Sequence, residues 1–235
     1  MIRNTRTGGD LMEPPLHGNQ GNRETLPLLE APLGLTVAIS REAGARGGSI
    51  ARRAGKRLGW QVYTQELLEF LGNNESARSH VLTDLPHDAA DWADRQLDRL
   101  KQEQIVKPGV ELGEMPRLIL TLAARGRVIL VGRGAGYLLP RDTTLHVRVV
   151  APLQDRIAYM AQHLRRTSDE AADQVRERDD QRADFLIATF NRRAGDLHDY
   201  DLVVNSQLLG EETGADLVEV AIRGKERLMS LREDE

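Results

Sequence analysis

The stretch from Leu35 to Leu58 constrains the fold of this 235-residue chain more than any other. It begins with a short apolar run that has the alternation typical of a β-strand and ends at Ser40. A glycine-rich loop follows, and a helical pattern with one apolar face then begins at Ser49. A strand, a tight loop and a helix in this order predict one βα unit, from which parallel sheets are built.

The loop between this strand and this helix contains three glycines, Gly44, Gly47 and Gly48. Glycines in this position let backbone N–H groups converge on an anion, and the helix N-terminus adds its partial positive charge. The standard phosphate-loop pattern also has a lysine beside the last glycine, whereas the only cations in this loop are Arg41 and Arg46. The loop alone therefore fits a phosphate-binding loop and an ordinary βα turn equally well.

Four further apolar runs have β-type sequences, at residues 60–63, 128–131, 145–150 and 202–204. The run at 128–131 is apolar throughout, as expected for a central parallel strand that is buried on both faces. Helical patterns lie between and after the runs, at residues 49–58, 64–70, 89–106, 115–124, 154–165, 168–193 and 212–231. Five strands that alternate with helices predict a doubly wound α/β domain with a parallel sheet.

Two of the predicted strands end in loops that are rich in glycine and arginine. One loop runs from Arg41 to Gly48 after the first strand, and the other from Gly132 to Gly136 after the third. Because ligands of parallel sheets bind beyond the carboxyl ends of the strands, both loops are expected at the same edge. This coincidence favours a phosphate-binding site over an ordinary turn.

The composition excludes several classes of protein. The chain contains no cysteine, so disulfides, thiolate chemistry and cysteine metal sites are excluded. The formal net charge of −4 gives no general attraction to nucleic acid or anionic membranes, and we expect neither as a partner. No apolar run reaches the roughly 18 residues of a membrane span, and the N-terminus lacks the apolar core of a signal peptide. We therefore expect a cytoplasmic protein, whose oligomeric state the sequence leaves open.

The domain organisation follows from changes in composition along the chain. Residues 1–32 are rich in glycine and proline without an apolar period, which predicts a disordered N-terminal tail before a folded domain at 33–235. Residues 72–114 are polar and then helical, which predicts an inserted helical segment. The helix that begins at Ser168 has an acidic first turn, but lacks the Glu or Gln that completes a capping box.

The order of these segments resembles the cytidylate kinase-like family, within the P-loop nucleoside monophosphate kinases. The resemblance covers residues 35–230 and is carried by four segments: A-I-S-R-E-A-G-A-R-G-G-S-I-A; V-I-L-V-G-R-G-A-G-Y-L-L-P; V-V-A-P-L-Q-D-R-I with the later R-E-R-D-D-Q-R-A-D-F; and Y-D-L-V-V-N-S. It implies a P-loop NTPase-type three-layer α/β/α fold with a five-stranded parallel sheet. The helical insert at 72–114 would lie on the acceptor side, and residues 165–195 would form a lid.

The same resemblance implies ATP-dependent phosphorylation of a (d)CMP-like nucleotide, with Mg²⁺. The donor phosphates would be bound by Gly44, Ala45, Arg46, Gly47, Gly48 and Ser49, of which Ser49 would also lie near the metal ion. The acceptor would be bound by Arg41, Arg133, Gly134 and Arg156. Catalysis would rest on Arg46, Arg133, Arg178 and Arg182, because phosphoryl transfer depends on positioning and on neutralising charge. The alternative for Arg178 and Arg182 is ion pairing with neighbouring acids on a solvated helix.

The chain departs from the pattern of authentic cytidylate kinases at two positions. The P-loop lysine, aligned near Gly47, is missing, and Gly134 replaces the aspartate after the glycine–arginine pair. The kinase-like branch itself often lacks the lysine, and Arg46 is the candidate for a replacement cation. Three hypotheses remain: an active nucleotide kinase, a nucleotide-binding regulatory protein with an impaired site, and a kinase of another small metabolite.

Overall fold

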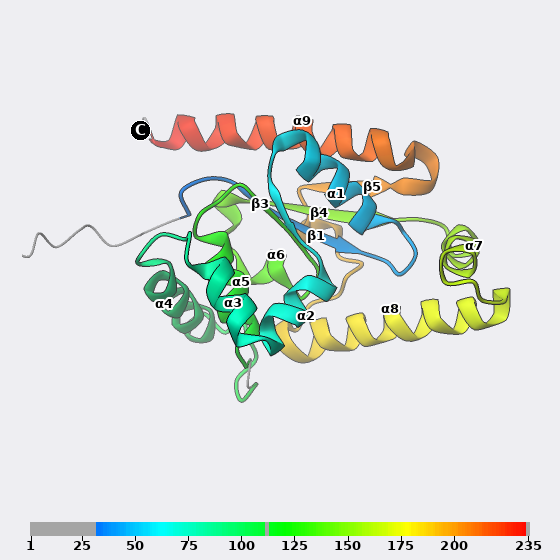
Figure 1. Ribbon diagram of the computed structural model, residues 1–235, viewed down its shortest axis with the longest axis horizontal. Helices are drawn as coiled ribbons and strands as arrows, with labels where there is room; N and C mark the ends of the chain where they lie inside the picture. The colour runs from blue at the N-terminus through cyan, green and yellow to red at the C-terminus, as the bar shows by residue number, and fades with distance from the viewer. Residues whose placement is uncertain (1–31, 111–112, 234–235) are drawn as a thin grey trace, which may run out of the picture.

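The computed structural model describes residues 32–110 and 113–233 of the chain. The tail predicted at residues 1–32 lies outside this part, apart from Pro32. Figure 1 shows a central sheet with helices on both of its faces, which is the predicted three-layer α/β/α arrangement. No helix in the two described stretches combines the length and the apolar character needed to cross a membrane.

The strands are β1 (Thr36–Arg41), β2 (Gln61–Tyr63), β3 (Val128–Val131), β4 (Thr144–Val150) and β5 (Leu202–Asn205). Their order across the sheet is β2-β3-β1-β4-β5, and every neighbouring pair is parallel. Over the described residues, the predicted five-stranded parallel sheet is therefore confirmed. β3 is buried along its whole length, as its uninterrupted apolar sequence requires.

One face of the sheet is covered by α1 (Gly47–Leu58) and α9 (Ser206–Glu233), which also contact each other. Ile50 of α1 and Val218 of α9 are fully buried in the core on this face. α9 begins before the predicted residue 212, but Gly210 interrupts it with a non-helical φ of 75° and ψ of 174°. The predicted start therefore corresponds to the helix that follows this kink.

The opposite face is covered by α5 (Met115–Ala123) and the short α6 (Ala135–Leu138). α5 was expected from its apolar period and from the proline in its first turn. α6 lies within the loop that was expected after β3. The chain therefore forms a short helix soon after this strand, and its Ala135 and Leu138 belong to the core on this face of the sheet. Two 3₁₀ turns, η1 (Arg141–Thr143) and η2 (Leu197–Asp199), precede β4 and β5.

Three helices lie outside α5, namely α2 (Gln65–Asn73), α3 (Glu75–Leu82) and α4 (Ala89–Gln102). The fully buried Trp92 of α4 belongs to the same core cluster as α5. α3 escaped prediction as a separate helix because none of its side chains is fully buried, so its apolar pattern is weak. α4 ends earlier than the predicted residue 106, since Gln104 adopts a left-handed φ of 55°.

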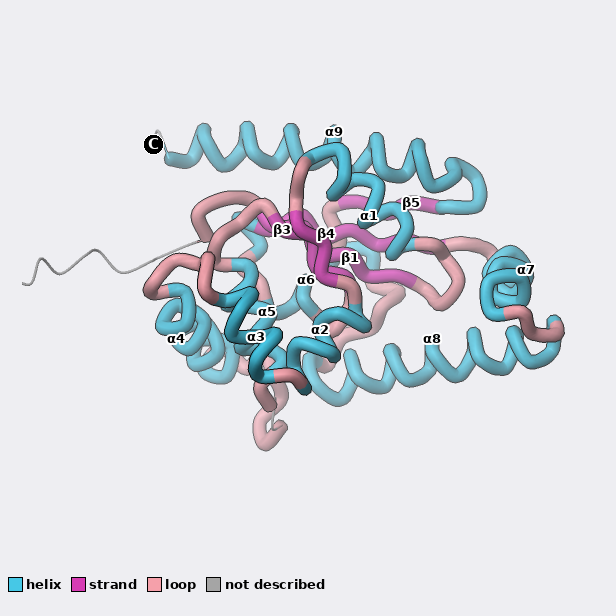
Figure 2. The backbone as a smooth tube through the Cα atoms, viewed as in Figure 1, coloured by secondary structure: helices cyan, strands magenta, loops and turns pink. Residues whose placement is uncertain are grey.

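The remaining helices are α7 (Leu153–Leu164), which follows β4, and α8 (Ser168–Phe190), which runs back on the side of the sheet away from α9 (Figure 2). The expectation that α8 lacks a capping box is wrong. Its N-cap is Thr167, whose hydroxyl accepts from the Glu170 N–H at 3.3 Å while the Glu170 carboxylate accepts from the Thr167 N–H at 2.9 Å. The helix ends before Asn191, which is left-handed, rather than at residue 193.

Candidate functional site

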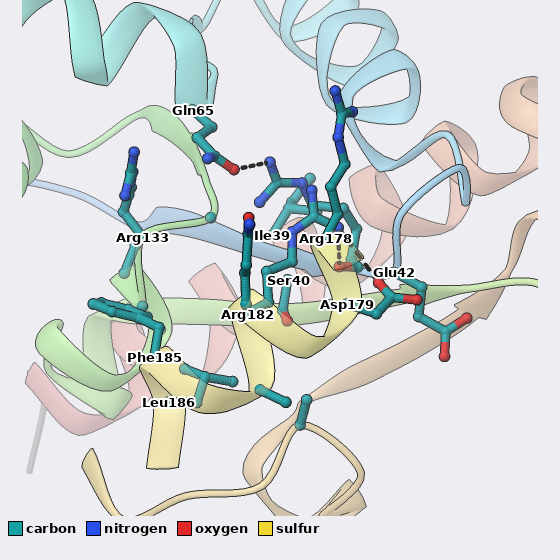
Figure 3. A pocket seen from close by; sticks show the side chains of 18 of the residues that line it. Ile39, Ser40, Glu42, Gln65, Arg133, Arg178, Asp179, Arg182, Phe185 and Leu186 are labelled. Atoms are coloured by element: carbon teal, nitrogen blue, oxygen red, sulfur yellow. Dashed lines mark hydrogen bonds and ion pairs between the residues drawn. The ribbon is translucent and has the colours of Figure 1, made fainter. Parts of the chain in front are cut away.

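A cavity of about 630 Å³ opens at the carboxyl edge of the sheet, between the ends of β1, β3 and β4 and the helices α2 and α8. Figure 3 shows arginine side chains from different elements, Arg133 after β3 and Arg178 and Arg182 on α8, among the residues that line it. The lining includes five arginines: Arg41, Arg133, Arg148, Arg178 and Arg182. All but Arg148 were predicted as site residues. Such a cluster suits a phosphorylated ligand, because guanidinium groups bind phosphate oxygens in pairs.

Arg41 ends β1 and connects the two glycine–arginine loops. Its guanidinium fills the space beside Gly132, which has a left-handed φ of 86° and no room for a side chain. One Nη donates to the Gln65 Oε1 at 2.8 Å. Burial, and secondarily the charge of Arg182, lowers the pKa of Arg41 to about 9, so the group keeps its charge at pH 7. The two loops therefore meet at one edge, as predicted.

Arg133 lies just beyond β3 and reaches toward α2. Its backbone is left-handed with φ 55°, and its guanidinium pairs with the Glu69 carboxylate. Burial lowers the pKa of Arg133, and its Nε is buried without a hydrogen-bond partner in the described part of the chain. An unpaired donor on a partly desolvated cation marks a place where an anionic ligand would be stabilised.

Arg178 and Arg182 line the cavity from α8. Burial lowers the pKa of Arg182, whose Nη1 lies 3.7 Å from the Asp179 Oδ1 and donates to the Arg41 carbonyl at 3.4 Å. Arg178 forms no ion pair within residues 32–110 and 113–233. The ion-pairing alternative therefore describes part of the environment of Arg182, but both side chains face the cavity.

Arg148 is the arginine that sequence reasoning missed. It lies inside β4, where its Nη1 donates to the Ser40 hydroxyl at 2.8 Å. A signal was present, because polar His146 and Arg148 alternate with apolar residues and therefore share one face of the strand. Because β4 was interpreted only as an apolar run, the polar face that carries His146 and Arg148 was overlooked.

Arg156, predicted to bind the acceptor, is not among the residues that line the cavity. It is buried beneath the glycine loop, where its Nη1 donates to the Ala43 carbonyl at 3.1 Å and to the Asp179 Oδ2 at 2.6 Å. Its Nε lies 3.3 Å from the Glu42 Oε2. Asp179 also accepts from the Ala43 N–H at 2.7 Å. These contacts clamp the loop onto α7 and α8 and occupy two of the acids that border the cavity.

The glycine loop has the backbone geometry expected of an anion site. Gly44 has φ 80°, and an added Cβ would lie 2.6 Å from the Arg156 carbonyl oxygen. At Gly47, a Cβ would lie 2.7 Å from that of Arg41, whereas Gly48 has more space. In the described part of the chain, no hydrogen bond engages the N–H groups of these three glycines. They stand at the N-terminus of α1, where unpaired N–H groups attract phosphate.

Three other predicted loop residues have separate environments. The Ala45 carbonyl accepts from the Ser206 hydroxyl at 2.8 Å, and the Ser49 hydroxyl accepts weakly from Arg52 at 3.5 Å. Arg46 adopts a left-handed φ of 60°, and its guanidinium lies 4.9 Å from the centre of the Tyr159 ring on α7. The guanidinium of the candidate replacement cation thus packs against Tyr159 of α7, and Arg46 is not among the residues that line the cavity.

One end of the cavity is aromatic. Tyr137, His146 and Phe185 line it, together with Gly134 and Leu186. Burial lowers the pKa of His146 to about 4, so the imidazole is neutral at pH 7. Its Nδ1 lies 2.8 Å from the Asp199 carbonyl, which can only accept, so Nδ1 carries the proton. A ligand in this cavity would therefore have both guanidinium groups and aromatic rings within its lining.

Comparison with solved structures gives two likenesses of low sequence identity. An uncharacterized protein from Eubacterium ventriosum ATCC 27560 has 16% identity and a TM-score of 0.55, covering 80% of this chain and 98% of that one. TT1252 from Thermus thermophilus has 16% identity and a TM-score of 0.43, covering 81% and 97%. The first likeness supports the fold alone, and the second is too weak to support an inference.

Comparison with curated proteins gives no match. A family model does match, that of the cytidylate kinase-like family, over residues 36–208. The matched range begins at β1 and ends just after β5, so it includes the glycine loop, the cavity and α8. It thus extends over well more than half of the sequence, and the chain belongs to the cytidylate kinase-like family.

Proposed function

We propose that the protein is a nucleoside monophosphate kinase-like phosphotransferase, which uses ATP and Mg²⁺ to phosphorylate a (d)CMP-like nucleotide in the cytoplasm. The observation that carries this proposal is the cavity lined by five arginines beside the N-terminus of α1. Phosphoryl transfer needs little covalent chemistry from the protein. It needs two phosphorylated ligands held in line and positive charge around the transferring group, and the arginines at this edge of the sheet would supply that charge.

The donor side fits a nucleotide triphosphate through its backbone. The N–H groups of Gly44, Gly47 and Gly48, which have no hydrogen-bond partner in the described part of the chain, would donate to a phosphate near the N-terminus of α1. The Ser49 hydroxyl in the first turn is the oxygen that would hold Mg²⁺ together with phosphate oxygens. The metal ion would neutralise charge on the transferring group when bound.

The acceptor side fits a monophosphate through its cations. Arg41, Arg133 and Arg182 all have pKa values lowered by burial, so their charges are costly in the absence of a counter-ion. A phosphate dianion would relieve this cost and accept several charge-assisted hydrogen bonds. Arg178 and Arg182 would bind the transferring group from α8, where charge on its equatorial oxygens must be neutralised.

A second candidate is a nucleotide-binding regulatory protein with an impaired catalytic site. The position of Arg46 favours it, because the guanidinium lies on the Tyr159 ring and no lysine stands at Gly47. The Ala43 N–H is also taken by the Asp179 carboxylate. Binding of a phosphate needs only the backbone groups, so it can persist where turnover has been lost.

The test is a coupled assay of ADP release across CMP, dCMP, UMP, AMP and GMP, with calorimetric titration of ATP and Mg²⁺ alongside. The kinase proposal predicts turnover with at least one pyrimidine monophosphate, and its loss in Arg133→Ala. Arg176→Ala on the exposed face of α8 is the matched control, since among the residues that the structure describes Arg176 pairs only with Asp173. ATP binding without turnover would support the second candidate. Neither binding nor turnover would contradict both.

A further inference from the structure

Phe185 is an aromatic side chain on the cavity wall that the phosphate chemistry does not use. It lies on α8 three residues after Arg182, and Figure 3 shows both side chains at the same cavity. At 100° per residue, Arg178, Arg182 and Phe185 fall within one narrow side of the helix. The ring is 39% exposed. One helix face therefore presents cations first and then an accessible aromatic ring.

Gly134 makes the space for this ring. Its backbone has φ 69°, and an added Cβ would lie 2.5 Å from Phe190 and 3.3 Å from Phe185. The two rings meet edge to face, with centroids 5.9 Å apart. A side chain at this position would collide with Phe190 and press against Phe185. Where the cytidylate kinase pattern has an aspartate, this chain thus has a glycine that leaves room for aromatic rings.

Two polar groups at this end of the cavity, the His146 Nδ1–H and the Tyr137 hydroxyl, already have partners within the protein. The His146 ring lies against Gly136, and its Nδ1–H is bonded to a carbonyl. The Tyr137 hydroxyl lies 3.4 Å from that of Tyr200, and its ring stacks on Phe190. These groups are poorly placed to distinguish hydrogen-bond donors from acceptors on a ligand. The exposed ring of Phe185 is free to stack.

The spacing along α8 matches a phosphorylated ligand with a planar ring. Phe185 is three positions after Arg182 in the sequence, which corresponds to a rise of about 4.5 Å along the helix axis. A phosphate at the arginines therefore leaves the next few ångströms of the ligand beside Phe185. We propose that Phe185 is the stacking platform for the acceptor's base, and that the site accepts nucleoside monophosphates with little preference among bases. This inference rests on the proposed function and widens its acceptor, because stacking on an aromatic ring tolerates every base.

The test compares calorimetric affinities for CMP, UMP, AMP and GMP with those for ribose 5-phosphate and inorganic phosphate. The four nucleotides should agree within about tenfold, a spread of about 1.4 kcal/mol. Ribose 5-phosphate should bind about 5- to 150-fold more weakly, which is the contribution of one stacked base. Phe185→Leu keeps an apolar side chain without the ring and should remove this advantage, whereas Phe185→Trp should keep it.

Ile187→Ala is the matched control, because Ile187 is 42% exposed on the same helix but does not line the cavity. The proposal is overturned if ribose 5-phosphate binds wild type as tightly as the nucleotides do. It is also overturned if one base binds more than about tenfold better than all others, or if Phe185→Leu binds like wild type with an unchanged melting temperature. In each case, phosphate binding that Arg133→Ala abolishes would leave the proposed function standing. If neither phosphate nor any nucleotide binds, the proposed acceptor site fails and the stacking platform with it.

Discussion

The cavity and the glycine loop are neighbours that use arginine in opposite ways. In the cavity, Arg41, Arg133 and Arg182 are partly desolvated and incompletely paired, and their pKa values are lowered. Around the loop, Arg156 of α7 is engaged by carbonyl and carboxylate oxygens, and the Arg46 guanidinium lies against the Tyr159 ring. The same residue type is thus left with donors available to a ligand in one region and is a structural clamp in the other. Burial and the supply of protein partners decide which role it has.

The largest expected effect is on turnover, through the cavity. Arg182→Ala should lower kcat by about 10²- to 10³-fold, because it removes a donor to charge that develops in the transition state. Steady-state kinetics with saturating ATP would measure it. Arg176→Ala, on the exposed side of α8, should leave kcat within about twofold of wild type. An equal loss in both variants would show that α8 as a whole, rather than the cavity charge, had been disturbed.

The next effect is on stability, through the clamp. Arg156→Ala should lower the free energy of unfolding by about 3 kcal/mol, since it leaves Asp179 without its main partner in a mostly buried site. Urea denaturation would measure the loss, with Arg166→Ala in the exposed turn between α7 and α8 as the control. Arg156→Lys should not restore stability, because an ammonium group cannot reach three oxygens in the same geometry. Unchanged stability in Arg156→Ala would contradict the structural role of Arg156, and with it the contrast between this residue and the arginines of the cavity.

A third effect concerns pH and the aromatic end of the cavity. His146 has a folded-state pKa of about 4 against an ordinary 6.5, so protonation favours the unfolded chain. Stability should therefore fall as the pH drops from 6.5 toward 4, by up to about 3 kcal/mol from this residue. Denaturation at several pH values would show it. His146→Gln should flatten the slope, whereas the exposed His80→Gln should not. Equal slopes in wild type and His146→Gln would contradict the assignment.

The smallest effect is expected at Arg46. From its contact with Tyr159, Arg46→Ala should cost about 0.5–1 kcal/mol of stability and leave ATP affinity and turnover nearly unchanged. Melting curves and the ADP-release assay measure the two quantities together. A hundredfold loss of turnover would show that Arg46 leaves the Tyr159 ring and acts as the replacement cation. Arg46 would then have a catalytic role, like the arginines of the cavity, rather than a structural one.

The sequence predicted the sheet and part of the cavity for definite physical reasons. Apolar runs mark buried parallel strands, and residues after such strands must gather at one edge, which brought Arg41 and Arg133 together. Arg178 and Arg182 share a helix face because they are four residues apart, but only the resemblance to the kinase-like family implied that this face belongs to the site. Arg148 and the role of Arg156 were not predicted, because the direction of a side chain and its partners depend on register and packing. The sequence alone contains neither.

α8 touches both regions within one turn of helix. Asp179 holds the Ala43 N–H of the glycine loop, and Arg182 donates to the Arg41 carbonyl at the start of the cavity. A ligand that changes either contact therefore changes the position that α8 offers to the other. If the proposed donor and acceptor sites both bind, this shared element would give them a coupling free energy, which must be reciprocal. Whatever factor the donor imposed on the affinity for the acceptor, the acceptor would impose on the affinity for the donor.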